Sequence, residues 1–223
     1  MEKISLDDST QKVPSGYSCL DSLMDGGIEP GIITELYGEG GAGKSNLAMI
    51  YSLSVLKEGR SVIYVDTEGF STERFLSISK GCTEYLPHMN IYRVKSLDDQ
   101  YLALIKSDKL IGEKRDSKHS IGIMVVDSLT NFFRMETGKD PSARMEGYEK
   151  QLSILSGIAL KYRIPVLITN QIYEDVNNNS LEPFGGFFID HAMKAIYRVE
   201  AFPHNGYHTS YYCPIYNNKA SGR

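Results

Sequence analysis

Short apolar runs alternate with amphipathic stretches along most of the chain, and this order predicts an α/β protein. The apolar runs show no period-two alternation, as expected of strands buried on both faces; they cover residues 32–37, 60–66, 90–94, 121–128 and 164–171. Helical spacing of apolar residues is found over residues 44–59, 72–80, 97–112 and 143–162. We therefore expect a mostly parallel central sheet with helices on both faces.

Polar segments set the expected boundaries of these elements. Ser96 is predicted to cap the third helix, with Asp99 three residues on, as in a capping box. The charged residues 112–120 and the polar residues 176–180 are expected to be surface loops. The tail, residues 207–218, is richer in Tyr and Thr and predicts antiparallel strand structure at the C-terminal edge.

Composition narrows the class of protein. A length of 223 residues fits one domain, so we expect a single core over 1–223 with a short N-terminal segment of about 1–13. No apolar run approaches the ~18 residues of a membrane span, and the polar N-terminus lacks a signal-peptide core. Three widely spaced cysteines predict neither a disulfide framework nor a zinc site, which favours the cytoplasm. The net charge of −4 argues against a strongly basic nucleic-acid binder but permits a local basic patch.

The strongest chemical signal is a glycine-rich segment where the first strand meets the first helix. It reads Gly-x-x-x-x-Gly-Lys-Ser, and its residues are Gly38, Glu39, Gly40, Gly41, Ala42, Gly43, Lys44 and Ser45, followed by Asn46. Glycines let backbone N–H groups surround phosphate oxygens, and the helix N-terminus adds partial positive charge. Lys44 would reach the β- and γ-phosphates and Ser45 would ligate Mg²⁺. A glycine-rich turn with a chance lysine is the competing interpretation, and the strand–helix context argues against it.

Three further polar residues follow apolar strands. Asp127 stands at the Walker B position, where a carboxylate holds Mg²⁺ through its water shell. Glu68 could orient and deprotonate an attacking water, and the Gln171 amide could sense a γ-phosphate. Each could also be an ordinary polar residue at a strand end, but ligands of open α/β sheets gather at the carboxyl ends of the strands.

Four motifs occur together in an order and spacing that resembles the RecA/RadA recombinase core, from about Val13 to Glu200. They are "SGYSCLDSLMDGGIEPGIITELYGEGGAGKS", "VDTEGFSTERF", "VVDSLTNFFR" and "VLITNQ" followed by "PFGGFFIDHA". The resemblance implies ATP and Mg²⁺ as cofactors, Gly38–Ser45 as Walker A, Asp127 as Walker B, Glu68 as the catalytic glutamate and Gln171 as the switch glutamine. It also implies that Arg74 packs on the adenine.

The same resemblance implies two DNA-binding loops. The first would be about Arg134–Tyr148, with Arg134, Lys139 and Arg144 as basic contacts. The second would be about Ile172–Phe188, which contains no Lys or Arg but carries the acidic residues Glu174, Asp175 and Glu182.

Departures from RadA indicate the branch of the family. Only about a dozen residues precede the core, so no helix–hairpin–helix domain is expected, and no phenylalanine begins the Phe-x-x-Ala docking motif of RadA filaments. Phe187 stands where RadA commonly has a histidine. These features resemble the archaeal RadB branch, a group of RadA paralogues.

Three functions follow from this resemblance. The leading hypothesis is a RadB-like mediator of homologous recombination and DNA repair, nucleoid-associated in the cytoplasm. It would bind ATP and DNA, single strands preferred, act on a RadA-type recombinase and be at most a weak DNA-dependent ATPase. A filament-forming recombinase is the second, with the missing docking motif and the acidic second loop against it. A KaiC-like ATPase that does not act on DNA is the third, with "TERF" and "FGGFFIDHA" against it. The oligomeric state stays open, with a homodimer as one option.

A second basic cluster near the C-terminus is a rival DNA contact. Its residues are Lys194, Arg198, Lys219 and Arg223, and four tyrosines that could stack on bases lie nearby, Tyr207, Tyr211, Tyr212 and Tyr216. Solvated surface charge and ordinary strand packing explain such residues equally well.

Overall fold

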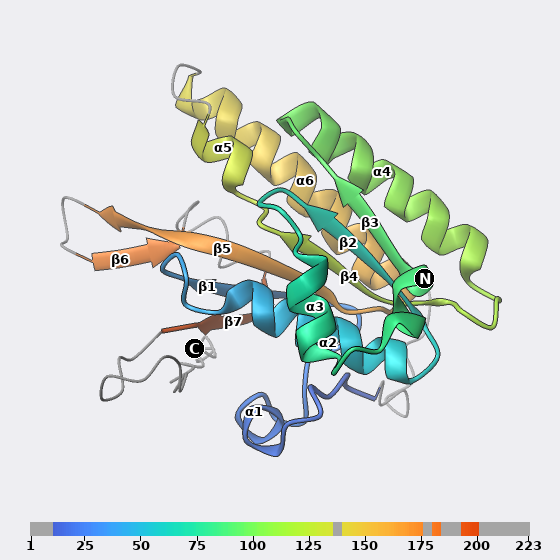
Figure 1. The fold of residues 1–223 in the computed structure, drawn as a ribbon. Coiled ribbons are helices and arrows are strands. Elements are labelled where there is room, and N and C mark those ends of the chain that lie inside the picture. Colours follow the sequence, from blue (N-terminus) through green and yellow to red (C-terminus); the bar gives the residue numbers. More distant parts are fainter. Residues whose placement is uncertain (1–10, 136–139, 176–179, 184–192, 201–223) are drawn as a thin grey trace, which may run out of the picture.

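The computed structural model describes residues 11–135, 140–175, 180–183 and 193–200, and its centre is a parallel β-sheet (Figure 1). The strand order is β3-β2-β4-β5-β1-β7, and every pairing along this path is parallel. The strands are β1 Ile33–Gly38, β2 Ser61–Asp66, β3 Met89–Arg93, β4 Ile121–Asp127, β5 Val166–Asp175 and β7 Ala195–Arg198. A short strand, β6 Ser180–Pro183, pairs antiparallel with the end of β5.

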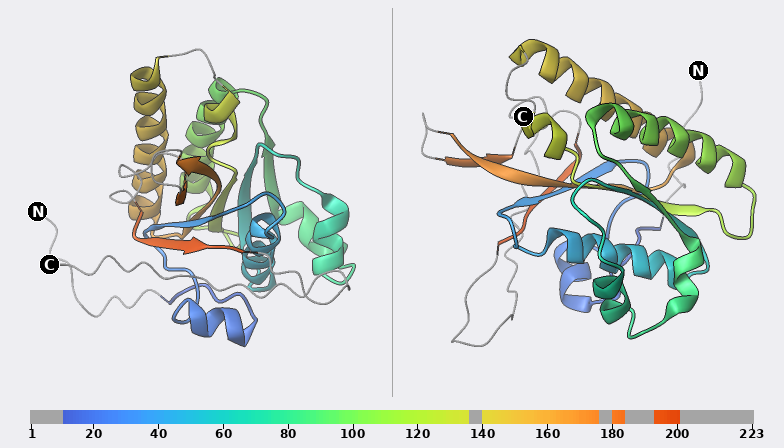
Figure 2. Two further views of the ribbon diagram at one scale, coloured as in Figure 1. Left: turned by 90° about the vertical axis from the view of Figure 1, so that its left-hand side faces the viewer. Right: turned by 45° about the horizontal axis from the view of Figure 1, so that its top comes forward.

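Helices cover both faces of the sheet, as the sequence pattern predicts (Figures 1 and 2). One face carries α1 Ser18–Leu23, α2 Lys44–Lys57, α3 Thr72–Ile78 and the 3₁₀ helix η1 Thr83–His88, and the other carries α4 Leu97–Lys114, α5 Asn131–Met135 and α6 Pro141–Tyr162. Successive side chains of one strand enter different cores. Val62 and Tyr64 of β2 join the core under α2, whereas Ile63 and Val65 join the core under α4 and α6. Because both faces are buried, these strands are apolar without alternation.

The first four expected strands are confirmed within a residue or two, and the fifth begins two residues late and continues beyond Gln171. β5 runs on to Asp175, where β6 pairs with it, so part of the expected second DNA-binding loop is a strand pair. The expected loop over residues 112–120 begins later than predicted, because α4 continues to Lys114. Ser96 does cap α4 by accepting a hydrogen bond from the Asp99 N–H, whereas the Asp99 carboxylate accepts from the Lys95 N–H instead of that of Ser96.

One expectation needs correction. The segment Arg134–Tyr148 is not mainly a loop: Arg134 lies in α5 and residues 141–148 form the start of α6, with Asp140 accepting a hydrogen bond from the Ser142 N–H at the helix start. The last described strand, β7, was not predicted, and it is parallel to β1. The predicted tail strand over residues 207–218 lies outside the described residues.

No helix in the described part of the chain is long and apolar enough to cross a membrane.

The carboxyl ends of the central strands meet at one edge of the sheet. Gly38 at the end of β1 is in register with Gln171 of β5, and Asp66 at the end of β2 is in register with Asp127 of β4. Backbone hydrogen bonds continue past the strands: the Thr67 N–H donates to the Asp127 carbonyl, and the Leu129 N–H donates to the Thr169 carbonyl. The sheet therefore brings together segments that are far apart in the sequence.

Candidate nucleotide-binding site

The glycine-rich loop spans the gap between β1 and α2, and its conformation needs glycine at several positions. Gly41 and Gly43 have φ angles of 80° and 102°, a region that other residues rarely adopt. Gly38 is required for a different reason, because a Cβ there would lie 2.1 Å from the Val199 carbonyl oxygen, which follows β7. The loop therefore brings its backbone to the start of α2, where N–H groups and the helix dipole favour an anion.

Lys44, the first residue of α2, is turned back onto this loop. Its ammonium donates hydrogen bonds to the carbonyl oxygens of Gly38, at 2.9 Å, and of Glu39, at 2.7 Å. The residue is 8% exposed, and this burial lowers the pKa of Lys44, while the nearby carboxylates of Glu68 and Asp127 act in the opposite direction. A phosphate bound beside this buried ammonium would favour its charged form.

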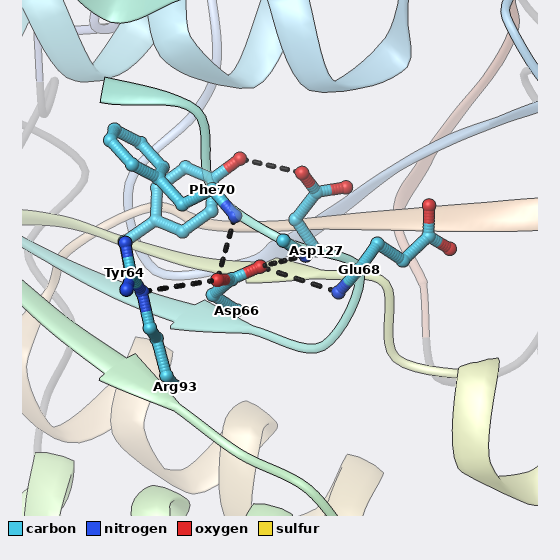
Figure 3. A network of polar contacts seen from close by, with 7 residues as sticks. Tyr64, Asp66, Glu68, Phe70, Arg93 and Asp127 are labelled. Carbon is cyan, nitrogen blue, oxygen red and sulfur yellow. Dashed lines mark hydrogen bonds and ion pairs between the residues drawn. The ribbon is translucent and has the colours of Figure 1, made fainter. Parts of the chain in front are cut away.

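Asp127 is buried at the end of β4 and is held by two hydroxyl groups. The Tyr64 hydroxyl donates to Oδ2 at 2.6 Å, as Figure 3 shows, and the Thr169 hydroxyl donates to Oδ1 at 2.5 Å. Burial raises the pKa of Asp127, and hydrogen bonds from Thr169, Tyr64 and Ser45 oppose the shift. The carboxylate and the Ser45 hydroxyl thus lie together, and such hard oxygen donors fit Mg²⁺. In the described part of the chain no three His, Cys, Asp or Glu side chains group as a metal site.

The loop that carries Glu68 is shaped by Asp66, a residue the sequence analysis did not single out. Its buried carboxylate accepts hydrogen bonds from the backbone N–H groups of Glu68 at 3.3 Å, Gly69 at 2.8 Å and Phe70 at 2.7 Å (Figure 3). Exposed Arg93, at the end of β3, places its Nε 3.9 Å from the same carboxylate. Asp66 therefore turns the chain so that the Glu68 side chain points away from it, as Figure 3 shows.

Glu68 belongs to a chain of contacts across the strand ends. The Ser128 hydroxyl donates to Glu68 Oε1 at 2.7 Å, and the Gln171 amide nitrogen donates to the same oxygen at 3.1 Å. On its other side the Gln171 amide oxygen accepts a hydrogen bond from the Arg134 guanidinium. The two candidate catalytic side chains, Glu68 and Gln171, are therefore in direct contact, and Arg134 of the expected DNA-binding set lies with them.

A second polar network lies beneath this edge, within the core on the α6 side. The Asn170 amide nitrogen donates to Glu35 Oε1 at 2.8 Å, and the Thr130 hydroxyl donates to the Asn170 amide oxygen. All three side chains are fully buried. They link β1, β5 and the turn after β4, which are the segments that carry the glycine-rich loop, Gln171 and α5.

In the described part of the chain, the other predicted site residues are not part of the cluster of Lys44, Asp127, Glu68 and Gln171. Arg74 is exposed on α3, where its backbone N–H is capped by the Ser71 hydroxyl, so its adenine contact stays a prediction. Arg144 lies half-buried on α6, and Lys139 is outside the described residues. In the rival cluster Lys194 is exposed and Arg198 is ion-paired with Glu200 at 2.5 Å. The rest of the rival cluster and Phe187 are also outside the described residues, namely Lys219, Arg223, Tyr207, Tyr211, Tyr212 and Tyr216.

The chain is similar to known proteins over most of its length. The family model described as Rad51 matches residues 8–205. A DNA repair and recombination protein RadB from Thermoplasma acidophilum is 49% identical over 203 residues, covering 91% of this chain and 86% of the relative. The protein of the same name from Thermoplasma volcanium is 50% identical, covering 91% and 84%. A third RadB, from Methanococcoides burtonii, is 34% identical, covering 85% and 83%.

Proposed function

Because this chain belongs to the archaeal RadB branch of the Rad51 family, we propose that it binds ATP with Mg²⁺ and binds DNA in homologous recombination and repair. In this role it assists a RadA-type recombinase as a mediator and hydrolyses ATP slowly. The relatives named above support the repair and recombination context, because each carries that description.

One observation carries the nucleotide part of the proposal. Lys44, Asp127, Glu68 and Gln171 come from four different strands or the segments that follow them, and they converge at the carboxyl edge of the sheet, next to the start of α2. Open α/β sheets bind ligands at this edge. A triphosphate there would meet backbone N–H groups, a lysine and a carboxylate–hydroxyl pair.

Each of these residues would have a different role in ATP hydrolysis. Lys44 would exchange its two loop carbonyls for β- and γ-phosphate oxygens, which are stronger acceptors because they are charged. Mg²⁺ held near Asp127 and Ser45 would neutralise charge that develops on the phosphates. The Glu68 carboxylate, oriented by Ser128 and Gln171, would accept a proton from the attacking water.

The filament-forming recombinase and the KaiC-like ATPase are less well supported. Similarity to RadB at 49% identity favours a repair role over signalling. The second loop of the expected DNA site carries acidic residues and no basic ones, which disfavours strand exchange along DNA. Formation of joint DNA molecules would distinguish a recombinase from a mediator, and salt-dependent binding to single-stranded DNA would exclude the KaiC-like alternative.

Two variants test the nucleotide site. Lys44→Ala is expected to weaken ATP binding at least about tenfold, since a hydrogen bond to a charged group contributes roughly 1.5–3 kcal/mol. Glu68→Gln is expected to keep ATP binding but lose most hydrolysis, because an amide cannot accept the proton. Titration with a fluorescent ATP analogue and single-turnover hydrolysis measure the two effects. Unchanged affinity in Lys44→Ala, or unchanged turnover in Glu68→Gln, would contradict the assigned roles.

The partner is tested by direct binding. The purified chain is titrated with a RadA-type recombinase in the presence of ATP, of ADP and of no nucleotide. We expect binding whose affinity differs between the ATP and nucleotide-free states, and the Lys44→Ala variant should lose that difference. Equal affinity in all three conditions would remove ATP from the proposed mediator role.

A further inference from the structure

Arg134 lies in α5, a segment that contacts both the Glu68 loop and α6. The Asn131 amide nitrogen donates to the Thr67 carbonyl at 2.8 Å, which ties the start of α5 to the loop that carries Glu68. Phe133 is fully buried and packs edge-on against Tyr148 of α6, with ring centroids 5.2 Å apart. Arg134 directly follows these anchored residues, so its position is set by packing and by a hydrogen bond, not by a free loop.

The contact of Arg134 determines which way the Gln171 amide faces. A guanidinium has only donors, so the amide must present its oxygen to Arg134 and its nitrogen to Glu68, as the structure has it. A flipped amide would place its oxygen against the Glu68 carboxylate, and the two acceptors would repel. Arg134 thus orients Glu68 through Gln171.

The charge of Arg134 also reaches the phosphate end of the site. It acts to lower the pKa of Lys44, in opposition to Glu68 and Asp127, so the guanidinium lies within electrostatic range of the P-loop lysine.

We propose that Arg134 is a positioning residue for ATP hydrolysis, which orients the Gln171 amide and the Glu68 carboxylate, and that it is not a DNA contact. The inference rests on the proposed ATP-dependent function. Because Arg134 belongs to α5, the same contact links the nucleotide site directly to the segment that follows β4.

The test compares three variants with the wild-type protein. Arg134→Gln is expected to slow single-turnover hydrolysis of radiolabelled ATP by about ten- to a hundredfold, since small misplacements of reacting groups have effects of this size. The dissociation constant for ATP should stay close to that of the wild type. Arg134→Lys should recover part of the rate, because it keeps a cationic donor without the planar fork. Arg115→Gln is the matched control, since Arg115 is exposed at the end of α4 and precedes the opposite end of β4.

A double-mutant cycle separates positioning from an independent effect. In a Gln171→Ala background, Arg134→Gln should cause no further loss of rate, because coupled residues are not additive. A further loss equal to that in the wild-type background would overturn the proposal. An unchanged rate of hydrolysis in Arg134→Gln would also overturn the proposal, whether or not the binding of this variant to single-stranded DNA becomes less salt-dependent.

Failure of the proposed function gives a different result. If the wild-type protein neither binds nor hydrolyses ATP and Lys44→Ala behaves identically, the nucleotide function is wrong and the role of Arg134 falls with it. If the wild-type protein binds and hydrolyses ATP while Arg134→Gln matches Arg115→Gln, only the role of Arg134 is wrong.

Discussion

At the scale of single residues, Asp127 makes the protein sensitive to pH. Burial raises its pKa above that of an aspartate in the unfolded chain, so the fold disfavours the ionised carboxylate. At low pH the Asp127 carboxyl is protonated in both the folded and the unfolded protein, and its burial costs no stability. The folded protein loses stability as pH rises through the folded-state pKa of Asp127, and the loss is complete at neutral pH. We therefore expect Asp127→Asn without Mg²⁺ to gain stability relative to the wild type as pH rises from acid to neutral.

The measurement is urea unfolding of both proteins across that pH range, repeated with Mg²⁺ and ATP. The added ligands should stabilise the wild-type protein more than Asp127→Asn, and the difference should shrink as pH falls and protons compete with the metal ion. A difference between the two proteins that does not change with pH would show that Asp127 titrates alike in the folded and unfolded states.

The sequence motifs identified residues such as Lys44 and Asp127, but they did not identify the residues that support these side chains through hydrogen bonds. Lys44 and Asp127 are recognisable because their neighbours along the chain form a pattern, and the structure places both beside Ser45. Asp66 lies only two residues before Glu68, yet its role depends on a turn that the pattern does not show. Tyr64 and Thr169 hold Asp127 from 63 and 42 residues away, and such pairings come from the sheet order alone.

At the scale of elements, the apolar runs predicted the central strands because burial on both faces leaves an unbroken signal. β7 was missed because it has only four residues, of which one is buried, and lies at the sheet edge. The helical pattern predicted α6 from residue 143, two residues late, whereas the family resemblance placed residues 134–148 in a loop. Asp140 before Pro141 is a helix-start signal in the sequence itself. Local capping chemistry would have corrected that boundary.

The turn between β2 and α3 gives a prediction at this scale. Asp66→Ala removes one acceptor from three backbone N–H groups, two of them at 2.8 Å or less, and should lower the free energy of unfolding by about 1–3 kcal/mol. It should also slow ATP hydrolysis more than it weakens ATP binding, because the Glu68 loop loses its support. Denaturant unfolding and the two nucleotide assays measure these effects.

Arg93→Gln is the control for this prediction. Arg93 approaches the same carboxylate at 3.9 Å, but its side chain is 68% exposed. An exposed ion pair contributes only about 0–1 kcal/mol, so this variant should remain close to the wild type in stability. If both variants lose equal stability, the ion pair and not the backbone turn supports the loop.

At the scale of the whole molecule, the nucleotide edge and the buried network below it form one connected unit. Gln171 contacts Glu68, while its neighbour Asn170 bonds Glu35 and Thr130 in the core. Gln171 and Asn170 are consecutive in β5, so a shift of the backbone at Gln171 would also move Asn170. The sheet therefore offers a physical route from the phosphate site to α5 and α6, which the sequence could not reveal because it depends on strand order.

The net charge of the molecule governs how it should bind DNA. At a formal charge of −4, contacts must come from a few basic side chains, so binding to single strands should be weak to moderate and fall steeply with salt. Each phosphate contact contributes about −0.7 to the log–log slope of affinity against salt. Charge-neutralising changes at Lys139 and Arg144 should flatten this slope by about that amount per contact, whereas Arg134→Gln should leave it unchanged.

The rival cluster is tested in the same assay with Lys194, Arg198, Lys219 and Arg223 neutralised together. Arg198 is already paired with Glu200, which reduces what it can offer to a phosphate, so we expect the smaller change from this set. Fluorescence anisotropy with a labelled single strand over a series of salt concentrations gives each slope. If neither these changes nor those at Lys139 and Arg144 alter the salt dependence, DNA contact lies elsewhere on the molecule. Salt-insensitive binding would mean instead that stacking and not charge holds the strand.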